Sequence, residues 1–398
     1  MRETPGVEFF RHDLGEPELA LLKEALAGRF LTTGPLTAQF ESRFSEYLGL
    51  DCAVGVTSCT AAMHLALLAW EIGPGDEVIT TPLTFMASAN AILHAGATPV
   101  FADVDPGTGN LDPDAVEAAL TPRTRAILPV HLYGTLCDMR RLRAVADRHD
   151  LIIIEDAAHC VEGRRDGFGP GSLGDAACFS FYATKNLTSG EGGAIAFRGQ
   201  DRSTLLRQLR LHGMSRDAHD RHHGGSVHYD MPLLGWKYNM DTIQAALLLP
   251  QLDRLEENLL RRDQVWSWYD EALADLPDLG RPDIPAGTRS ARHLYTRWVD
   301  AKIRDAVISG LRARGIGCAV NFLPLHQLSF YRDRYRLRLG QFPRAEAIGS
   351  ATITLPFYPT LTRSEVREVG DALAATLDEA RAGAGSQRPA PRGPDRSP

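Results

Sequence analysis

Strand-like and helix-like patterns of hydrophobic residues alternate along the chain between about residues 50 and 200. Short runs rich in β-branched and aromatic residues are each followed by a longer stretch with helical periodicity. Strands that alternate with helices predict a mostly parallel sheet with helices on both faces. The strand-like runs are nearly continuous in apolar residues, which indicates that both faces are covered. The predicted strands are 77–81, 98–104, 126–134 and 151–158, and the predicted helices are 60–72, 84–96 and 137–150.

A second, smaller α/β unit is predicted after a long helical pattern that opens near Asp241. Pro250 lies inside this pattern, and we expect a kink there because proline cannot donate a backbone hydrogen bond. We predict a large domain over 1–250 with an N-terminal arm, a small domain over 251–379, and a disordered tail over 380–398. The small domain is expected to contain a strand at 293–299, a helix at 303–314, a strand-like patch near 317–322 and a last helix from Ser364.

Composition and charge exclude several classes of protein. The chain has 398 residues, 44% hydrophobic and 23% charged, so it holds enough apolar mass for a core. A net charge of −7 argues against a general nucleic-acid binder. No apolar run approaches the ~18 residues of a membrane span, and the N-terminus lacks a signal-peptide core, so we expect a cytoplasmic protein. Six cysteines without a C-x-x-C pair are interpreted as buried apolar residues.

Lys185 is the first candidate for chemistry. It lies in a polar, Gly-rich loop directly after the apolar run 177–183. Most lysines are simply surface residues. A lysine desolvated among apolar residues, however, loses its proton and becomes a nucleophile able to form a Schiff base. Its predicted neighbours decide between the two interpretations.

Asp156 is the first such neighbour, because it ends the predicted strand 151–158 after a run of apolar residues. The carboxyl ends of parallel strands are where open α/β sheets bind ligands. A carboxylate there can keep the ring nitrogen of pyridoxal phosphate protonated, so that the ring acts as an electron sink. A helix-capping role is the alternative for Asp156. Glu155 points to the other face of the strand and is the weaker candidate.

Ser58 and Thr60 stand at the start of the helix predicted over 60–72, where free backbone N–H groups and the helix dipole favour an anion. A plain N-cap explains Ser58 equally well. Ser180 could supply another hydroxyl to the same phosphate. Phe85 follows the next strand end and could stack on a cofactor ring, although an isolated aromatic residue is more often part of the core.

Together, several segments resemble the DegT-type sugar aminotransferases, pyridoxal-phosphate enzymes that act on nucleotide-linked ketosugars. The resemblance extends over roughly residues 8–378 and keeps the motifs in order. It implies the aspartate aminotransferase fold, fold type I among pyridoxal-phosphate enzymes, with a large, mostly parallel sheet domain and a smaller C-terminal α/β domain. The segments are VTSCTAAMHLAL, TTPLTFMASANAI, PVHLYG, IIEDAAH, SFYATKNLTSGEGGAI and GWKYNMDTIQAAL.

The resemblance also implies roles for individual residues. Lys185 becomes the Schiff-base lysine and proton shuttle, and Asp156 becomes the partner of the pyridinium nitrogen. The residues implied in binding the cofactor are Ser58, Thr60, Ala61 and Ser180 at its phosphate, Phe85 stacked on its ring and His159 beside it. Substrate contacts are implied for His326, near the diphosphate, and for Tyr182.

A homodimer with shared active sites is implied as well. The family completes its phosphate site with a loop from the neighbouring subunit that often reads G-Y-N-Y-R. Here the loop reads Gly235-Trp236-Lys237-Tyr238-Asn239. Lys237 and Asn239 keep one positive charge and one amide with their places exchanged, which leaves open which of them reaches the phosphate.

Within the family, the chain is most similar to enzymes that aminate C4 of a nucleoside-diphosphate sugar, with L-glutamate as the expected donor. The segments LHGMSRDAHDRH, GWKYNMD, HQLSFYRDRY and LPFYP carry this similarity. The alternatives are a sugar 3-aminotransferase, a dehydratase on the same fold and a non-catalytic regulatory relative. Dehydratase relatives carry histidine at the position of Lys185. A Rossmann oxidoreductase would need G-x-G-x-x-G at a strand–helix turn, where the chain has none.

Two further patterns favour no additional function. The histidines between 212 and 228 do not have the spacing of a metal site, so no metal is expected. The arginine-rich segment 331–344 is interpreted as a solvated face or a contact to a nucleotide diphosphate, because the chain as a whole is acidic.

Overall fold

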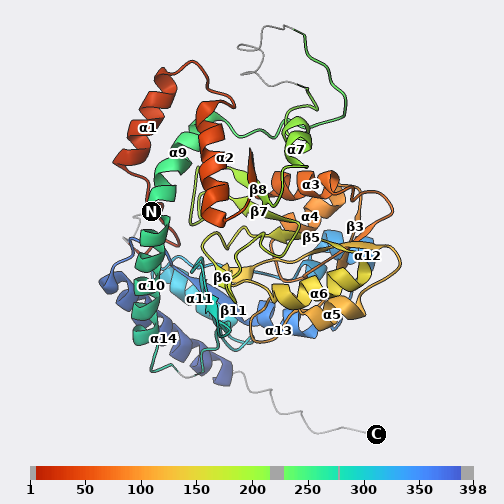
Figure 1. Cartoon of the computed structure of the whole chain (residues 1–398). Helices are drawn as coiled ribbons and strands as arrows, with labels where there is room; N and C mark the ends of the chain where they lie inside the picture. The colour runs from red at the N-terminus through yellow and green to blue at the C-terminus, as the bar shows by residue number, and fades with distance from the viewer. Residues whose placement is uncertain (1–5, 216–227, 277, 387–398) are drawn as a thin grey trace.

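A seven-stranded sheet forms the centre of the molecule in the computed structural model, which describes residues 6–215, 228–276 and 278–386 (Figure 1). Its strand order is β1-β8-β7-β5-β4-β2-β3. β8 is antiparallel to both neighbours and the remaining pairs are parallel, so the predicted mostly parallel sheet is confirmed. The strands are β1 Cys52–Val56, β2 Glu77–Thr80, β3 Thr98–Phe101, β4 Thr124–Leu128, β5 Ile152–Asp156, β7 Ala176–Ser180 and β8 Gly193–Phe197.

Apolar side chains cover both faces of this sheet. On one face, Val54 and Ile195 pack with Met63 of the first central helix. On the other face, Phe179 packs with Phe44 and Leu248. The continuous apolar texture of the strands therefore has the structural basis predicted from the sequence. The helices around the sheet are α1 Glu16–Ala27, α2 Pro35–Leu48, α3 Cys59–Ala69, α4 Ala87–His94, α5 Pro113–Ala118, α6 Met139–His149, α7 Ser203–Leu209 and α9 Thr242–Asp253.

The long helical pattern after Asp241 forms two helices. α9 begins with a capping box between Asp241 and Gln244 and continues through Pro250. The chain turns at Arg254, whose N–H bonds to the carbonyl of Gln251 rather than to that of Pro250, before α10 begins. The predicted interruption is present, but it lies at Arg254. The helix continues through Pro250 because it tolerates the loss of the one backbone hydrogen bond that proline cannot donate.

A second apolar core lies over the C-terminal part of the chain. It includes Tyr269 of α10, Leu311 of α11 and Leu373 of α14, together with Val7 from the N-terminal arm. α10 and α14 lie side by side (Figure 1). The proposed domain boundary at residue 250 falls within α9 and stays a prediction. The elements of this part of the chain include α10 Leu255–Ala272, β10 Tyr295–Trp298, α11 Arg304–Ala313, η2 Leu325–Gln327, α12 Ser329–Tyr335, α13 Pro343–Ala351, β11 Thr352–Leu355 and α14 Arg363–Ser386. Of these, η2, α12 and α13 pack instead in smaller clusters that include Leu83 and Phe101.

Two segments differ from the patterns expected for this second unit. The patch 317–322 is not a strand and pairs only through an isolated bridge between Ala319 and Thr354. α14 continues to Ser386, into the segment assigned to the tail, because its alanines favour helix. Residues 387–398 lie outside the described part of the chain.

The cysteines and helices bear on two further expectations. All six cysteines are free and buried, as expected for apolar core residues. In the described ranges, no helix has the length and apolar character needed to cross a bilayer.

Candidate active site

The predicted site residues gather where the strands of the sheet end. Asp156 ends β5 and Ser180 ends β7, while Phe85 follows β2. β1 runs in the same direction as β7, because both are antiparallel to β8, so Ser58 after β1 belongs to the same edge. The alternation of strands and crossovers therefore places side chains that are distant in sequence at one edge.

Asp156 is 5% exposed and its carboxylate is held on both oxygens. The hydroxyl of Ser88 donates to Oδ2 at 2.7 Å, and the backbone N–H of Ala158 donates to Oδ1 at 3.1 Å. The Cys59 thiol lies 3.8 Å from Oδ1. A fixed, buried carboxylate at a strand end fits the ring nitrogen of pyridoxal phosphate. Sequence reasoning identifies Asp156 but misses the two side chains, Ser88 and Cys59, that hold it.

Lys185 is the amine of the site. Its backbone N–H bonds to the carbonyl of Tyr182 in a tight turn at 2.9 Å. Burial lowers the pKa of Lys185 to about 8, although the nearby carboxylate of Asp156 and the Cys59 thiol act in the opposite direction. The amine therefore loses its proton more readily than an ordinary lysine, as a nucleophile and proton carrier requires.

His159 and Phe322 provide flat surfaces beside this pair. Their rings stack with centroids 5.9 Å apart and planes inclined by 20°. Nδ1 of His159 accepts the backbone N–H of Tyr133 at 3.3 Å. Burial, together with the charge of Lys185, holds the pKa of His159 well below its usual value. The ring is therefore neutral and carries its proton on Nε2.

The N-terminus of α3 is the candidate phosphate site. Ser58 is its N-cap, and its side chain accepts the N–H of Ala61 at 3.1 Å. Thr60 is half-buried in the first turn, where backbone N–H groups have no partner within the helix. The Ser180 hydroxyl accepts the N–H of Tyr182 at 3.4 Å. Ser58 thus acts as an N-cap, which is one of the two roles considered for it. The helix end itself fits an anion.

Two aromatic side chains of the site are exposed. Phe85 is 55% exposed and Tyr182 is 47% exposed. Phe85 lies 6.1 Å from Phe322, ring centroid to ring centroid. Phe85 is therefore not a core residue of the isolated chain, which fits its predicted contact with a cofactor ring.

The loop 235–239 lies against the start of α3 in its own chain. The carbonyl of Tyr238 accepts the N–H of Thr57 at 2.9 Å. Asn239 is buried, and its amide donates to the hydroxyl of Thr33 at 2.8 Å. Lys237 is exposed, and its ammonium donates to Oδ1 of Asn239. The resemblance does not tell which of Lys237 and Asn239 reaches the phosphate. In the structure Lys237 is exposed and Asn239 is buried, so the two residues differ in environment.

His326 is a buried residue of η2. Its side chain is 1% exposed and its Nε2 lies 3.0 Å from a carboxylate oxygen of Glu346. Burial lowers its pKa, so the ring is not a cation at neutral pH. Its proposed contact with a substrate diphosphate stays a prediction that this orientation does not support.

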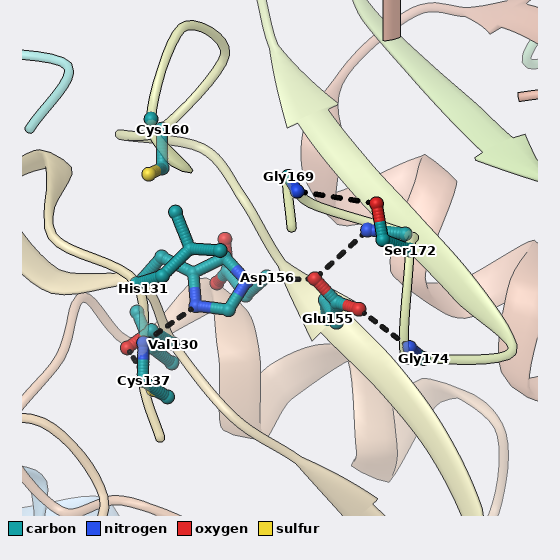
Figure 2. Close-up of polar contacts among 12 residues, drawn as sticks. Val130, His131, Cys137, Glu155, Asp156, Cys160, Gly169, Ser172 and Gly174 are labelled. Carbon is teal, nitrogen blue, oxygen red and sulfur yellow. Dashed lines mark hydrogen bonds and ion pairs between the residues drawn. The ribbon is translucent and has the colours of Figure 1, made fainter. Parts of the chain in front are cut away.

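Glu155 is hydrogen-bonded within the fold, in keeping with its place on the opposite face of the strand from Asp156. Glu155 and His131 face each other (Figure 2). Oε2 of Glu155 lies 2.7 Å from Nε2 of His131. Glu155 also accepts the N–H groups of Gly171 and Gly174. Nδ1 of His131 accepts the N–H of Cys137, so its proton is on Nε2, donated to Glu155.

His131 of this pair also bonds through its backbone to Asp156 at the end of β5. The backbone N–H of His131 donates to the carbonyl of Asp156 at 3.0 Å, and the N–H of Asp156 donates to the carbonyl of Pro129 at 2.8 Å. Sequence reasoning does not single out His131. Nothing in the sequence around His131 indicates that its side chain contacts the carboxylate of Glu155 in the following strand.

The histidine cluster of the sequence is only partly described. His219, His222 and His223 lie outside the described residues, as does part of the segment 211–222. Among the residues that the structure covers, no group of three or more histidine, cysteine or acidic side chains is arranged to hold a metal ion.

A buried aspartate, a desolvated lysine and a helix N-terminus at one sheet edge fit the site of a pyridoxal-phosphate enzyme of fold type I. Residues 12–374 match the DegT/DnrJ/EryC1/StrS aminotransferase family. The chain belongs to this family. It is thus a pyridoxal-phosphate-dependent sugar aminotransferase, and the expected fold class, cofactor and type of enzyme are confirmed.

Individual relatives agree with this assignment. The chain is 43% identical over 366 residues to the spore coat polysaccharide biosynthesis protein SpsC of Bacillus subtilis, covering 90% of this chain and 94% of that protein. It is similar to S. venezuelae DesV, solved with a ketimine intermediate, at 38% identity and a TM-score of 0.86, covering 94% of this chain and 98% of that chain. Helicobacter pylori PseC, an aminotransferase involved in pseudoaminic acid biosynthesis, has 26% identity and a TM-score of 0.88, covering 94% of this chain and 100% of that chain.

Proposed function

We propose that this aminotransferase moves an amino group from L-glutamate to the C4 keto group of a nucleoside-diphosphate sugar, of the dTDP-4-keto-6-deoxyhexose or UDP-4-ketopentose type. The product is an amino sugar for a natural product or a cell-surface glycan. The observation that supports the proposal is the pKa of Lys185, which burial lowers to about 8 although the charge of Asp156 acts on the same amine in the opposite direction. The roles of SpsC in a coat polysaccharide and of PseC in pseudoaminic acid biosynthesis support a sugar substrate.

Each residue of the site has a task in this reaction. Pyridoxal phosphate, when bound, withdraws electrons from the carbon next to the transferred nitrogen. Asp156 keeps a proton on the ring nitrogen, and Ser88 holds the carboxylate in position. Lys185, with its lowered pKa, can take a proton from one carbon and return it to another. The first turn of α3 and Ser180 hold the phosphate.

A homodimer with shared sites is part of the proposal. Lys237 is the better candidate to reach a partner's phosphate, because its side chain is exposed and carries a positive charge. The amide of Asn239 is instead occupied by Thr33 of its own chain. Asn239 thus orients the ammonium of Lys237, and Lys237 supplies the charge.

The nucleotide diphosphate requires local positive charge in an acidic chain. Arg332, Arg334 and Arg336 are exposed on and after α12. This helix is connected to the α4 region by a hydrogen bond from the Tyr331 hydroxyl to Asn90. We therefore assign the diphosphate to these arginines, with Tyr182 toward the sugar, in preference to the buried His326.

The direct test is amination of defined substrates. The purified protein with pyridoxal phosphate and L-glutamate would be incubated with a panel of dTDP- and UDP-4-ketosugars, and product masses would be read. An amine at C4, located by NMR of the product, is the expected outcome. Amination at C3 or loss of water without a new amine would replace the proposal with the 3-aminotransferase or the dehydratase. Lys185 itself counts against the dehydratase and, with Asp156, against a non-catalytic relative.

A further inference from the structure

Arg262 is a buried cation whose guanidinium makes no hydrogen bond within the described part of the chain. It lies on α10 and is 6% exposed. Its Nη1 is fully buried and has no hydrogen-bond partner among the described residues. Burial lowers its pKa, although no pH that a protein tolerates removes the charge of arginine. Buried charged groups in proteins are normally hydrogen-bonded, so these free donors need an explanation.

Glu162 neutralises this charge without satisfying the donors. Its nearest oxygen lies 3.7 Å from Nη1 of Arg262, beyond hydrogen-bond distance. Both carboxylate oxygens of Glu162 instead accept from Nδ2 of Asn186, each at 3.0 Å. The charge pair with Glu162 accounts for the burial of Arg262. The N–H groups of its planar guanidinium still have no hydrogen-bond acceptor in the described part of the chain.

Arg262 and Lys185 line the same cleft. Its walls come from the Lys185 segment, the α9–α10 junction, the N-terminal arm over residues 10–13 and the turn 357–359. Asn258, 4% exposed on the same face of α10, contributes a buried Oδ1 that also lacks a partner in the described part of the chain. Lys185, Asn258 and Arg262 thus border one cleft, and the polar side-chain groups of Asn258 and Arg262 in it are not hydrogen-bonded to the described part of the chain.

We propose that Arg262 binds a carboxylate of the amino donor, an acidic amino acid. The inference rests on the proposed function in taking that donor to be dicarboxylic. A carboxylate is planar and accepts two parallel N–H groups from a guanidinium, which matches the unused donors of Arg262. A diphosphate carries more negative charge than a carboxylate and would be repelled more strongly by Glu162, which already pairs with Arg262 at 3.7 Å, so the single charge of a carboxylate fits better.

Binding of glutarate to the pyridoxal-phosphate-loaded enzyme, measured by calorimetry, tests this assignment. Glutarate has the two carboxylates of glutamate and no amine, so the measurement does not depend on turnover. We expect Arg262→Met to weaken glutarate binding roughly 30-fold or more. Arg261→Met is the matched control, because Arg261 is the adjacent residue but is exposed and paired with Glu257. This control is expected to bind glutarate as the wild type does.

The competing explanation is that Arg262 only neutralises Glu162. The double variant Arg262→Met/Glu162→Gln removes both charges and keeps a partner for Asn186, so it remains informative if Arg262→Met alone does not fold. We expect it to keep the melting temperature of the wild type but to bind glutarate as weakly as Arg262→Met. A double variant that binds glutarate normally would overturn the proposal.

Two further arms separate this inference from the proposed function. If UDP or dTDP competes with glutarate and also depends on Arg262, the site is a diphosphate site and the proposal is wrong. If glutarate binds through Arg262 but no nucleotide sugar is aminated, the proposed sugar substrate fails while the carboxylate site stands. If nucleotide sugars are aminated and the Arg262 variants bind glutarate normally, only the carboxylate site fails.

Discussion

The hydroxyl of Ser88 donates a 2.7 Å hydrogen bond to Oδ2 of Asp156. Ser88 in turn lies 3.0 Å from the hydroxyl of Thr84, so that a short chain of hydroxyl groups runs from the turn after β2 to the end of β5. These groups are buried, where hydrogen bonds to a charged acceptor are stronger than in water. The orientation of the carboxylate therefore depends on the segment that follows β2, which is separated from β5 in the sheet by β4.

Ser88→Ala tests this dependence. A hydrogen bond to a charged group contributes about 1.5–3 kcal/mol, so we expect activity to fall at least ~10-fold while the protein stays folded. The visible spectrum of the bound cofactor is also expected to shift its pH dependence. Ser350→Ala, at a serine outside the site whose hydroxyl bonds to the carbonyl of Ala347, is the control. A Ser88→Ala variant that matches Ser350→Ala in both readouts would contradict the role of Ser88.

Lys185→Ala is expected to abolish both the visible absorbance of the bound cofactor and transamination, because only the lysine amine can link to the cofactor and move the proton. Asp156→Ala is expected to retain some cofactor and lose most activity, since the ring nitrogen would no longer stay protonated. Absorbance spectra and the half-reaction with L-glutamate measure the two effects separately. Near-normal turnover by Lys185→Ala would make the assignment of the site wrong.

The pH dependence of the amine provides an independent check. Burial disfavours the charged form of Lys185, so its pKa is lowered to about 8 and the amine is mostly neutral at pH values above that point. In cofactor-free protein, we expect the rate of reductive methylation at Lys185 to rise with pH and level off above about 8. Peptide mass spectrometry gives the rate, and exposed Lys302 corrects for the reagent. Continued rise up to the ordinary lysine value of ~10.4 would show that burial does not shift the group.

Shared active sites predict complementation between inactive subunits. Lys185→Ala and Lys237→Ala would each be inactive or nearly so as homodimers. If Lys237 serves the partner's phosphate, a mixed dimer contains one site with both lysines, and mixing the variants after mild dissociation restores part of the activity. The measurement is activity against mixing ratio, with light scattering for mass. A fully active monomer at micromolar concentration would exclude the shared site.

The nucleotide is expected to contribute most of the substrate's binding energy. Contacts far from the reacting carbon can orient the sugar, so their loss lowers kcat/KM. We expect a decrease on the order of 100-fold or more when a nucleoside-diphosphate 4-ketosugar is replaced by its 1-phosphate or by the free sugar. Steady-state rates on the three compounds decide the point. Equal rates would show that the enzyme recognises the sugar alone.

Local patterns in the sequence account for the parts of the fold that can be predicted. The strand ending in Asp156 and the apolar run before Lys185 are continuous segments, and their alternation with helices determines which edge they share. The interruption expected at Pro250 occurs instead at Arg254, because the hydrogen bonds that close a helix are not visible in residue types alone. The antiparallel direction of β8 is likewise not visible in the sequence, since its residues have the texture of any buried strand.

Side-chain partners distant in sequence cannot be predicted in the same way. Arg262 has the pattern of an ordinary charged residue on an amphipathic helix, and nothing in its neighbours shows that it is buried in the cleft of Lys185. The resemblance assigns His326 to a substrate diphosphate, which stays a prediction, but it gives no sign of the contact between the His326 ring and the carboxylate of Glu346. Such contacts depend on packing between elements, which periodicity does not encode.

The reversed direction of β8 has a consequence for the catalytic lysine. Lys185 lies in the connection between β7 and β8, two paired antiparallel strands, rather than in a crossover that must return over a helix. Both ends of this connection are therefore held by one ladder, at Ser180 and Gly193. Closing a short loop costs little chain entropy, and each doubling of length adds only about 0.6 kcal/mol. The amine is thus ordered at low entropic cost, in a segment whose two ends belong to a single ladder rather than to a crossover helix.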